Sequence, residues 1–493
     1  MQQRTVRFIE THLTLDLVWW VLLPALLLLF QWRSIVQPND FWWHVRVGQL
    51  TLEQGSIPRT DLFSFTHAGE TWVNQAWLMQ VWLYLQLRLG GLPLVIFLHG
   101  LAIAAGYACL QAALDRGGRP LGPALITFAA AAIGLRNMAV RPQTISFLFM
   151  GLLVLLLERA GKGRRRALWL LPPLFALWAN CHGAFIFGLA YLGLHLGGRA
   201  LEAARARTWA AERRDLIALA LATVASAAAL ALTPEGPAGL VTYVLGFVRA
   251  PQTVNMNQEF VPLSARQLDG AALFLGLLAL TVGLARGKGR LRARHWLPLL
   301  VLTAGALWAV RVAPWAGFAL APALADLYLS PGSGAPRRAG KPALNLALLT
   351  VLAAALLYVL PWLRPVLHPF ALDTWDAGKT PTAAVDHLCR TVPAGTRGYQ
   401  DQGFASYLIY ACPALPTFVD TRIELFPLEQ WQDYLAVAAG RFDGEEILER
   451  YGVDYLLFSV KDQKDAIRAA EASAHWRETY RDEEAVVFLR AGD

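Results

Sequence analysis

The chain has 493 residues, of which 56% are hydrophobic and only 16% are charged, and its mean hydropathy is +0.39. This composition excludes an ordinary soluble protein and predicts an α-helical polytopic membrane protein. The formal net charge of +8 comes mostly from Lys and Arg clusters between apolar segments. That pattern is typical of a topology signal, so no nucleic acid is expected among the partners.

The first apolar segment, residues 14–32, is long enough to cross a bilayer, and Arg4 and Arg7 precede it. Positive residues favour the cytoplasm, so the N-terminus is expected inside and residues 33–91 form a large first external loop. Within this loop, residues 77–90 are interpreted as an interfacial helix that ends at Gly90 and Gly91. The alternative for this segment is a short crossing.

If the remaining apolar segments cross the membrane in alternating directions, every strongly basic loop, including residues 162–166, lies on the same side of the membrane. This consistency predicts about eleven crossings and a second external loop at residues 233–270. After the segment at 14–32, the expected crossings are residues 92–114, 121–133, 144–157, 168–178, 184–196, 216–232, 271–284, 296–310, 312–327 and 344–362. Residues 1–363 are therefore expected to form the membrane domain.

Residues 364–493 differ in composition and are expected to form an extracytoplasmic α/β domain. Helical patterns are expected at residues 381–388, 428–439 and 444–451, and strands at residues 417–420, 455–460 and 485–489. Cys389 and Cys412 both lie in this region. In an oxidising compartment they could form a disulfide bond. The alternative is two free buried cysteines, and the sequence leaves both options open.

The polar, aromatic-rich segment at residues 38–77 directly follows the first crossing. Asp40 and His44 are four residues apart, so a helix starting near Pro38 places them on one face. A carboxylate beside a membrane mouth is able to act as a general base, with Asp61 near it in sequence and Trp43 available to line a pocket. The alternative for Asp40 is a plain helix-capping residue.

Basic or imidazole side chains also mark three later external turns, at Arg141, His182 and Arg311. Together with Arg46 they are predicted to hold the phosphate of a lipid-linked donor, because cations stabilise the charge of a phosphate leaving group. The alternative is that each Arg extends towards lipid headgroups, and that His182 is structural. Asn180 beside His182 is a predicted substrate contact.

The chain has no P-loop, GxSxG, HExxH or dinucleotide fingerprint. It resembles bacterial proteins of the GT-C glycosyltransferase superfamily along its whole length. The resemblance rests on the segments DFWWHVR at 40–46, GSIPRTDLFSFT at 55–66, RPQ at 141–143, WANCHG at 178–183 and VDTR at 419–422. It implies a polyprenyl-phosphate or polyprenyl-pyrophosphate sugar donor and makes Asp40 the catalytic carboxylate. Glu259 matches the later external Glu of oligosaccharyltransferases, although a solvated loop charge is the alternative.

Two departures from the family pattern bear on a metal. Asn39 stands before Asp40 where protein mannosyltransferases have a pair of acids, and residues 135–143 contain no carboxylate. A divalent cation such as Mg or Mn, with Asp40 and Glu259 as ligands, is therefore left open. The departures favour a monophosphate-linked donor over a pyrophosphate-linked one.

These observations predict a hexosyl- or pentosyltransferase in a bacterial inner membrane, which transfers a sugar from a polyprenyl-phosphate donor to an extracytoplasmic glycan, lipid or protein. Asp40 and His44 are the predicted catalytic residues, and Trp43, Asp61, Asn180 and Glu259 the predicted substrate contacts. The alternatives are a transporter or flippase of lipid-linked saccharides, and a membrane scaffold whose external domain binds a partner.

Overall fold

The computed structural model describes residues 13–36, 38–249, 258–330, 340–367 and 380–491. The chain divides into two compact units, and each is described by itself. Unit 1 contains residues 1–34, 96–237 and 259–367, and unit 2 contains residues 35–95, 238–258 and 368–493. Arg4 and Arg7, on which the orientation of the first crossing rests, lie outside the described residues.

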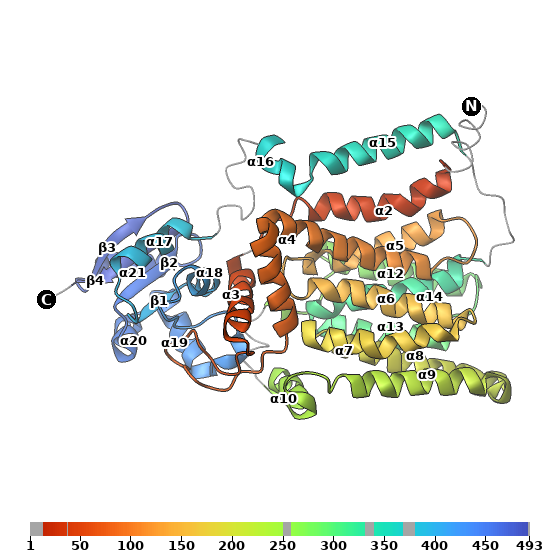
Figure 1. The fold of residues 1–493 in the computed structure, drawn as a ribbon, viewed down its shortest axis with the longest axis horizontal. Helices are drawn as coiled ribbons and strands as arrows, with labels where there is room; N and C mark the ends of the chain where they lie inside the picture. The colour runs from red at the N-terminus through yellow and green to blue at the C-terminus, as the bar shows by residue number, and fades with distance from the viewer. Residues whose placement is uncertain (1–12, 37, 250–257, 331–339, 368–379, 492–493) are drawn as a thin grey trace. The chain divides into compact units, whose positions relative to one another are not determined.

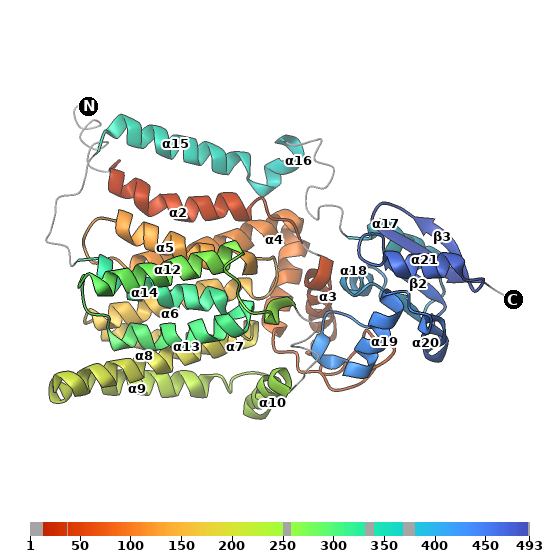
Figure 2. The same cartoon turned by 180° about the vertical axis from the view of Figure 1, so that it is seen from behind.

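Unit 1 is a bundle of helices that lie side by side, as Figure 1 shows, and Figure 2 shows the same bundle from behind. Its helices are α2 (Leu15–Gln31), α5 (Leu121–Gly134), α6 (Thr144–Gly161), α7 (Leu171–Cys181), α8 (Phe185–Ala206), α9 (Trp209–Ala229), α12 (Leu268–Ala285), α13 (Ala293–Trp308), α14 (Ala313–Tyr328), α15 (Pro342–Tyr358) and the short α16 (Arg364–Leu367). Short 3-10 turns η1 (Leu135–Asn137), η2 (Arg165–Leu170), η4 (Val310–Val312) and η5 (Pro361–Leu363) join some of them.

Three described helices are long and apolar enough to cross a membrane, namely Trp77–Ala113, Thr144–Gly161 and Leu268–Ala285. Shorter apolar helices add Leu15–Gln31, Leu121–Asn137 and Pro342–Tyr358. The helix ranges follow the apolar segments of the sequence closely, because a run of apolar residues in lipid must satisfy its backbone hydrogen bonds internally.

Helix α4 (Trp77–Ala113) passes from unit 2 into unit 1. Its backbone is non-helical at Gly90 and Gly91, and Gly91 has a φ of +66° that favours glycine. The predicted break at these two glycines is therefore confirmed. Farther along α4, a Cβ built at Gly106 would lie 2.3 Å from the carbonyl oxygen of Phe147, so this glycine allows α4 and α6 to pack closely.

Unit 2 combines α3 (Pro38–Gln54), most of α10 (Gly236–Arg249) and the C-terminal residues. The C-terminal helices are α17 (Thr382–Thr391), α18 (Gln402–Ala411), α19 (Leu428–Ala438), α20 (Gly444–Tyr451) and α21 (Lys464–Ala472), with the 3-10 turn η6 (Ile423–Leu425). They accompany a sheet of β1 (Gly398–Gln400), β2 (Tyr455–Ser459), β3 (Trp476–Arg481) and β4 (Ala485–Arg490). The strand order is β1-β2-β4-β3, and only the β1–β2 pair is parallel.

The strand predicted at residues 417–420 is wrong. Thr417 forms only an isolated bridge with Ser64, in the segment after α3. The apolar side chains of Phe418 and Val419 instead enter the core of unit 2, where both are fully buried. Cys389 and Cys412 form a disulfide between α17 and the end of α18, which answers the question that the sequence left open.

Candidate functional site

Asp40 lies in the first turn of α3, and its side chain is partly exposed. His44 follows one helical turn later and is 9% exposed. The predicted helix start near Pro38 is therefore correct. Residues four apart in a helix lie on one face, so the carboxyl group of Asp40 and the imidazole of His44 share a face of α3.

A chain of two buried amides fixes the ring of His44. The Nε2 amide group of Gln80 lies 3.1 Å from His44 Nδ1, and Gln80 Oε1 accepts a hydrogen bond of 2.8 Å from Asn74 Nδ2. An amide nitrogen only donates, so His44 Nδ1 accepts and the neutral ring carries its proton on Nε2, an assignment made from the hydrogen-bond network. His44 is therefore a donor at Nε2.

Asp61 lies in a buried cluster with Arg422, which sequence reasoning did not assign to the site. Arg422 Nη2 donates to Asp61 Oδ1 at 2.5 Å and to Asp420 Oδ2 at 2.6 Å. Asp61 also accepts from the backbone N–H groups of Phe63 and Ser64. These donors hold the segment after α3 against the VDTR segment, and they give Asp61 a structural role. Its contact with an acceptor stays a prediction.

Trp43 belongs to the aromatic cage around the same guanidinium. The Arg422 carbon Cζ lies 6.0 Å from the centre of the Trp43 ring, 4.9 Å from Trp72 and 5.1 Å from Phe63. The indole N–H of Trp43 donates to Thr421 Oγ1 at 2.9 Å. Trp43 is thus 7% exposed and stabilises the cluster through its ring and its N–H. Its predicted substrate contact remains untested.

Arg46 lies on α3 with a partly exposed side chain. Its Nη1 group donates to Gln49 Oε1 at 3.0 Å, while its buried Nε has no hydrogen-bond partner among the described residues. An unpaired buried N–H costs about 1–3 kcal/mol. Arg46 thus retains a donor that an anionic group would satisfy, which agrees with its predicted phosphate contact without establishing it.

In unit 1 the structure brings Arg141 and Arg311 to one short segment. Arg141 pairs with Glu259, and the guanidinium of Arg311 lies 4.9 Å from the ring centre of the next residue, Phe260. The backbone N–H of Val310 donates to Val261 at 2.9 Å, which ties the same segment to the turn of Arg311. The sequence predicted both arginines, but not that residues 259–261 connect them.

His182, the third of these residues, is tied to the first turn of α6. Its Nδ1 lies 2.9 Å from Ser146 Oγ, which also accepts from the indole N–H of Trp178 at 2.8 Å. The backbone N–H of Ala184 donates to the same Nδ1 at 3.3 Å. Since Nδ1 accepts from two donors, the neutral ring of His182 carries its proton on Nε2. His182 and His44 therefore have the same tautomer.

Asn180 ends α7 beside His182. Its Nδ2 group donates to the backbone oxygens of Ala176 at 2.8 Å and Leu232 at 2.9 Å. Both amide protons are used to hold the end of α7 against the end of α9, so this group is structural. The predicted contact between Asn180 and a substrate stays a prediction.

The three predicted phosphate residues of unit 1 share a position that the sequence did not reveal: each lies two or three residues before the start of a helix. Arg141 precedes α6, His182 precedes α8, and Arg311 precedes α14. A helix N-terminus presents unpaired backbone N–H groups and about half a positive charge. The side chains and the helix starts therefore add positive potential in the same region of the bundle.

The residues named as possible metal ligands do not fit that role well. The carboxylate of Glu259 is paired with Arg141, whose fixed positive charge opposes a cation there. Across the described part of the chain, no group of three or more His, Cys, Asp or Glu side chains is placed to hold a metal ion. We therefore derive no step through a metal.

The residues that sequence reasoning missed are Gln80, Asn74, Ser146, Trp178 and Arg422. All five are buried. Gln80, Ser146 and Arg422 contact a predicted site residue directly, while Asn74 and Trp178 hold Gln80 and Ser146 in turn. For Gln80, Asn74 and Ser146 the signal in the sequence was a polar residue among apolar or aromatic ones, which is costly unless it is paired. Trp178 and Arg422 lie in two of the segments that carry the resemblance.

No protein-family model and no curated protein matches the sequence. Solved structures do. The oligosaccharyltransferase of Archaeoglobus fulgidus in its apo form matches with a TM-score of 0.53 and 13% identity, over 97% of this chain and 74% of that chain. The oligosaccharyltransferase AglB of the same organism, solved with an inhibitory peptide and a dolichol-phosphate, gives a TM-score of 0.55 and 12% identity with the same coverage.

ArnT from Cupriavidus metallidurans in the apo state matches with a TM-score of 0.51 and 13% identity, over 96% of this chain and 97% of that chain. The fold is of the GT-C type. The resemblance to GT-C glycosyltransferases predicted from the sequence is thus confirmed at the level of the fold. At identities this low the likeness shows the fold alone, so activity has to be argued from the residues.

Proposed function

We propose that the protein is a membrane glycosyltransferase that moves one sugar from a polyprenyl-phosphate donor to an extracytoplasmic acceptor, which is a glycan, a lipid or a protein. The observation that carries this proposal is the set of three helix starts in unit 1 that bear Arg141, His182 and Arg311. A transferase with a lipid phosphate leaving group needs such a set, because negative charge develops on the phosphate as the sugar departs.

In this mechanism the carboxylate of Asp40 takes the proton of the acceptor hydroxyl or amine as the acceptor attacks the anomeric carbon. The bond between that carbon and the phosphate oxygen breaks, and the phosphate leaves with the electron pair on its polyprenyl carrier. The Nε2–H group of His44 orients Asp40 on the same face of α3. Arg46 adds positive charge near the start of α3.

The leaving phosphate receives charge-assisted hydrogen bonds from Arg141 and Arg311 and a hydrogen bond from the Nε2–H of His182. Trp43, Asp61, Asn180 and Glu259 remain candidates for acceptor contacts, and the structure adds that Asp61 and Glu259 are already engaged by Arg422 and Arg141. The dolichol-phosphate in the archaeal oligosaccharyltransferase structure supports a lipid-phosphate carrier for this fold. A monophosphate donor needs no metal step in this scheme.

The membrane topology of the proposal has about eleven crossings, a cytoplasmic N-terminus and residues 364–493 outside the cytoplasm of a bacterial inner membrane. Residues 1–363 form the membrane domain. The disulfide between Cys389 and Cys412 supports this orientation, because disulfides persist in oxidising compartments. Labelling an engineered cysteine in residues 162–166 from either side of the membrane tests it.

The proposal is tested by Asp40→Asn in the purified full-length protein, with a panel of radiolabelled polyprenyl-phosphate sugars as donors. We expect sugar transfer to fall by at least about 1,000-fold, since the general base is removed. Glu53→Gln is the matched control, because Glu53 is an exposed carboxylate at the other end of the same helix. Full activity of Asp40→Asn would remove Asp40 from the mechanism, and no transfer by the wild type from any donor would overturn the assignment.

A further inference from the structure

A recess at the opposite end of the bundle lies outside the machinery proposed above. It is a small recess of about 20 Å³, enough for one oxygen-sized group, and it opens to the surface of unit 1 where α6 and α8 end and α9 begins. Its polar lining includes His195 and Arg199 of α8, Arg165 of η2 and Asp215 of α9. Its remaining walls are mostly leucine side chains.

Two polar atoms in the lining have no hydrogen-bond partner among the described residues, namely His195 Nδ1 and Arg199 Nε. His195 is only 4% exposed, and Arg199 lies one helical turn farther along the same face. Leaving such buried groups unpaired costs about 1–3 kcal/mol each. Both unpaired atoms can donate a hydrogen bond, and both belong to residues that line the recess.

Gly161, at the end of α6, lines the recess beside two guanidinium groups. A Cβ built at Gly161 would lie 4.0 Å from Arg199 Nη1 and 3.9 Å from Arg294 Nη1. Both guanidinium groups therefore reach the end of α6, although Arg294 is already paired with Glu202, and a guanidinium matches a phosphate with paired N–H groups.

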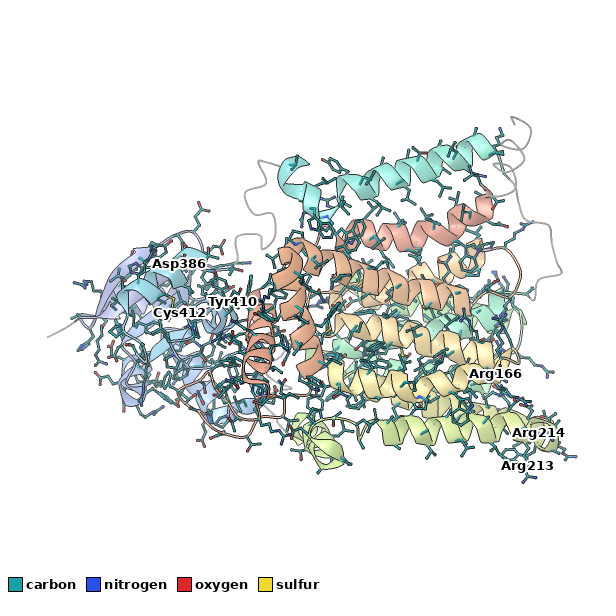
Figure 3. The ribbon with its side chains drawn as sticks, viewed as in Figure 1. Arg166, Arg213, Arg214, Asp386, Tyr410 and Cys412 are labelled. Carbon is teal, nitrogen blue, oxygen red and sulfur yellow. A yellow bond between two sulfur atoms is a disulfide. The ribbon has the colours of Figure 1, made fainter. Side chains whose placement is uncertain are left out.

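The surface around the recess is strongly basic. Residues 158–166 and 199–215 contain ten Lys and Arg against four Asp and Glu. Figure 3 shows Arg166, Arg213 and Arg214 at this same end of the bundle. Their positive potential favours an anionic over a zwitterionic ligand.

The apolar part of the site indicates that the anion carries hydrocarbon chains. Leu157, Leu168, Leu216 and Leu219 line the recess, and each is less than 8% exposed. Outside it, Trp169 is 56% exposed and Trp209 is 52% exposed. Exposed tryptophans next to basic residues are typical of the level of the lipid headgroups.

We propose that this recess binds the phosphate headgroup of an anionic phospholipid, with Arg199 and Arg165 on the phosphate and His195 beneath it. The existing partners do not prevent this. Arg165 pairs with Asp215, and both side chains are more than a third exposed, so that pair contributes little and opens at small cost. Arg199 keeps its bond to Glu212 through Nη2 and still offers Nη1, which lies 4.0 Å from a Cβ built at Gly161.

The test compares Gly161→Glu with Gly161→Gln in the full-length protein. Gly161 is exposed at a helix end, so both variants are expected to fold. The two side chains have nearly the same size, but the Glu carboxylate meets Arg199 and Arg294 and competes with a phosphate. Mass spectrometry measures how much phosphatidylglycerol each protein retains through detergent exchange. Phosphatidylcholine serves as the zwitterionic comparison, and soluble glycerol phosphate is added as a competitor.

We expect the wild type and Gly161→Gln to retain phosphatidylglycerol at least about ten-fold better than phosphatidylcholine, and Gly161→Glu to lose this preference, as the loss of a charge-assisted contact predicts. Equal retention by both variants would overturn the site. Competition by glycerol phosphate at equal concentration would overturn the lipid as its source. Sugar transfer per folded molecule does not enter this test, so its result is independent of the proposed glycosyltransferase activity.

Discussion

The two ends of the helix bundle in unit 1 use positive charge in opposite ways. Where α6 and α8 end, Arg159 and Arg205 lie in the last turns, and cations there are stabilised by the helix dipole. Arg141, His182 and Arg311 instead lie two or three residues before α6, α8 and α14, where the positive end of a helix dipole disfavours a cation.

The difference separates charges that the neighbouring helix dipole favours from charges that it disfavours. At the basic end, dipoles, ion pairs and the orientation of the chain in the membrane all account for Lys and Arg. At the other end the helix start beside each cation does not stabilise it, although Glu259 pairs with Arg141. An anionic ligand would offset the positive potential near these helix starts. The comparison therefore favours a binding site at this end of the bundle, which has fewer charges.

The largest expected effect concerns stability at the basic end. Asp326 is buried and pairs with Arg116 at 2.8 Å, Arg292 at 2.5 Å and His295 at 2.7 Å. Asp326→Asn leaves these groups without their shared counter-charge and should cost about 3–5 kcal/mol. The midpoint of thermal unfolding in detergent measures the loss.

Arg165→Gln is the control for that prediction, since it removes only an exposed pair and should cost about 1 kcal/mol or less. Sugar transfer per folded molecule should be unchanged in both variants. Equal stability of Asp326→Asn and the wild type would remove the structural role that we assign to the basic end.

A partly buried carboxyl group in unit 2, that of Asp401, offers a second test of how a charge beside a helix start affects stability. Asp401 caps α18 by accepting from the N–H of Gly403 at 2.8 Å, and burial raises the pKa of its carboxyl group to about 6. An acid with a raised folded-state pKa contributes stability that is present below its unfolded pKa, near 4, and is lost as the pH rises through 6. Asp401→Asn keeps the cap without the charge.

We therefore expect Asp401→Asn to be more stable than the wild type at pH 7, by up to about 3 kcal/mol, and to lose this advantage near pH 4. Unfolding midpoints measured from pH 4 to pH 7.5 provide the check. A constant difference between the two proteins across this range would contradict the prediction.

An intermediate effect on activity is expected at the helix starts. Arg141→Gln should lower sugar transfer about 10- to 100-fold, because one charge-assisted contact to the leaving phosphate is lost. Arg213→Gln, an exposed Arg at the basic end, should change it less than about two-fold. If both variants lose the same activity, the two ends do not differ as proposed.

The smallest effect is expected from the hydroxyl group that orients His182. Ser146→Ala removes the donor to His182 Nδ1, so part of the ring population shifts to the tautomer without a proton on Nε2. We expect a loss of about three- to ten-fold in kcat, with KM for the donor changed less. Ser146→Thr keeps a hydroxyl group and should recover most of the activity. A loss of equal size in Ser146→Thr would point to packing around Trp178 instead.

The sequence by itself determined the helices and several local features of the site. Apolar runs in lipid have to be helical, so the ranges near α5, α6 and α12 followed directly, as did the break at Gly90 and Gly91. The spacing of Asp40 and His44 was enough to place them on one face of a helix. These are local properties, set by neighbours within a turn or two.

Only the tertiary structure decided which distant residues meet. Asp61 and Arg422 are 361 positions apart, and Ser146 and His182 are 36 apart. Neither pairing leaves a periodic signal, because a buried polar group needs one partner of matching chemistry and not a repeating pattern. The strand expected at residues 417–420 failed for the same reason: its apolar side chains match a strand, but the cage around Arg422 and the core of unit 2 fix the backbone there.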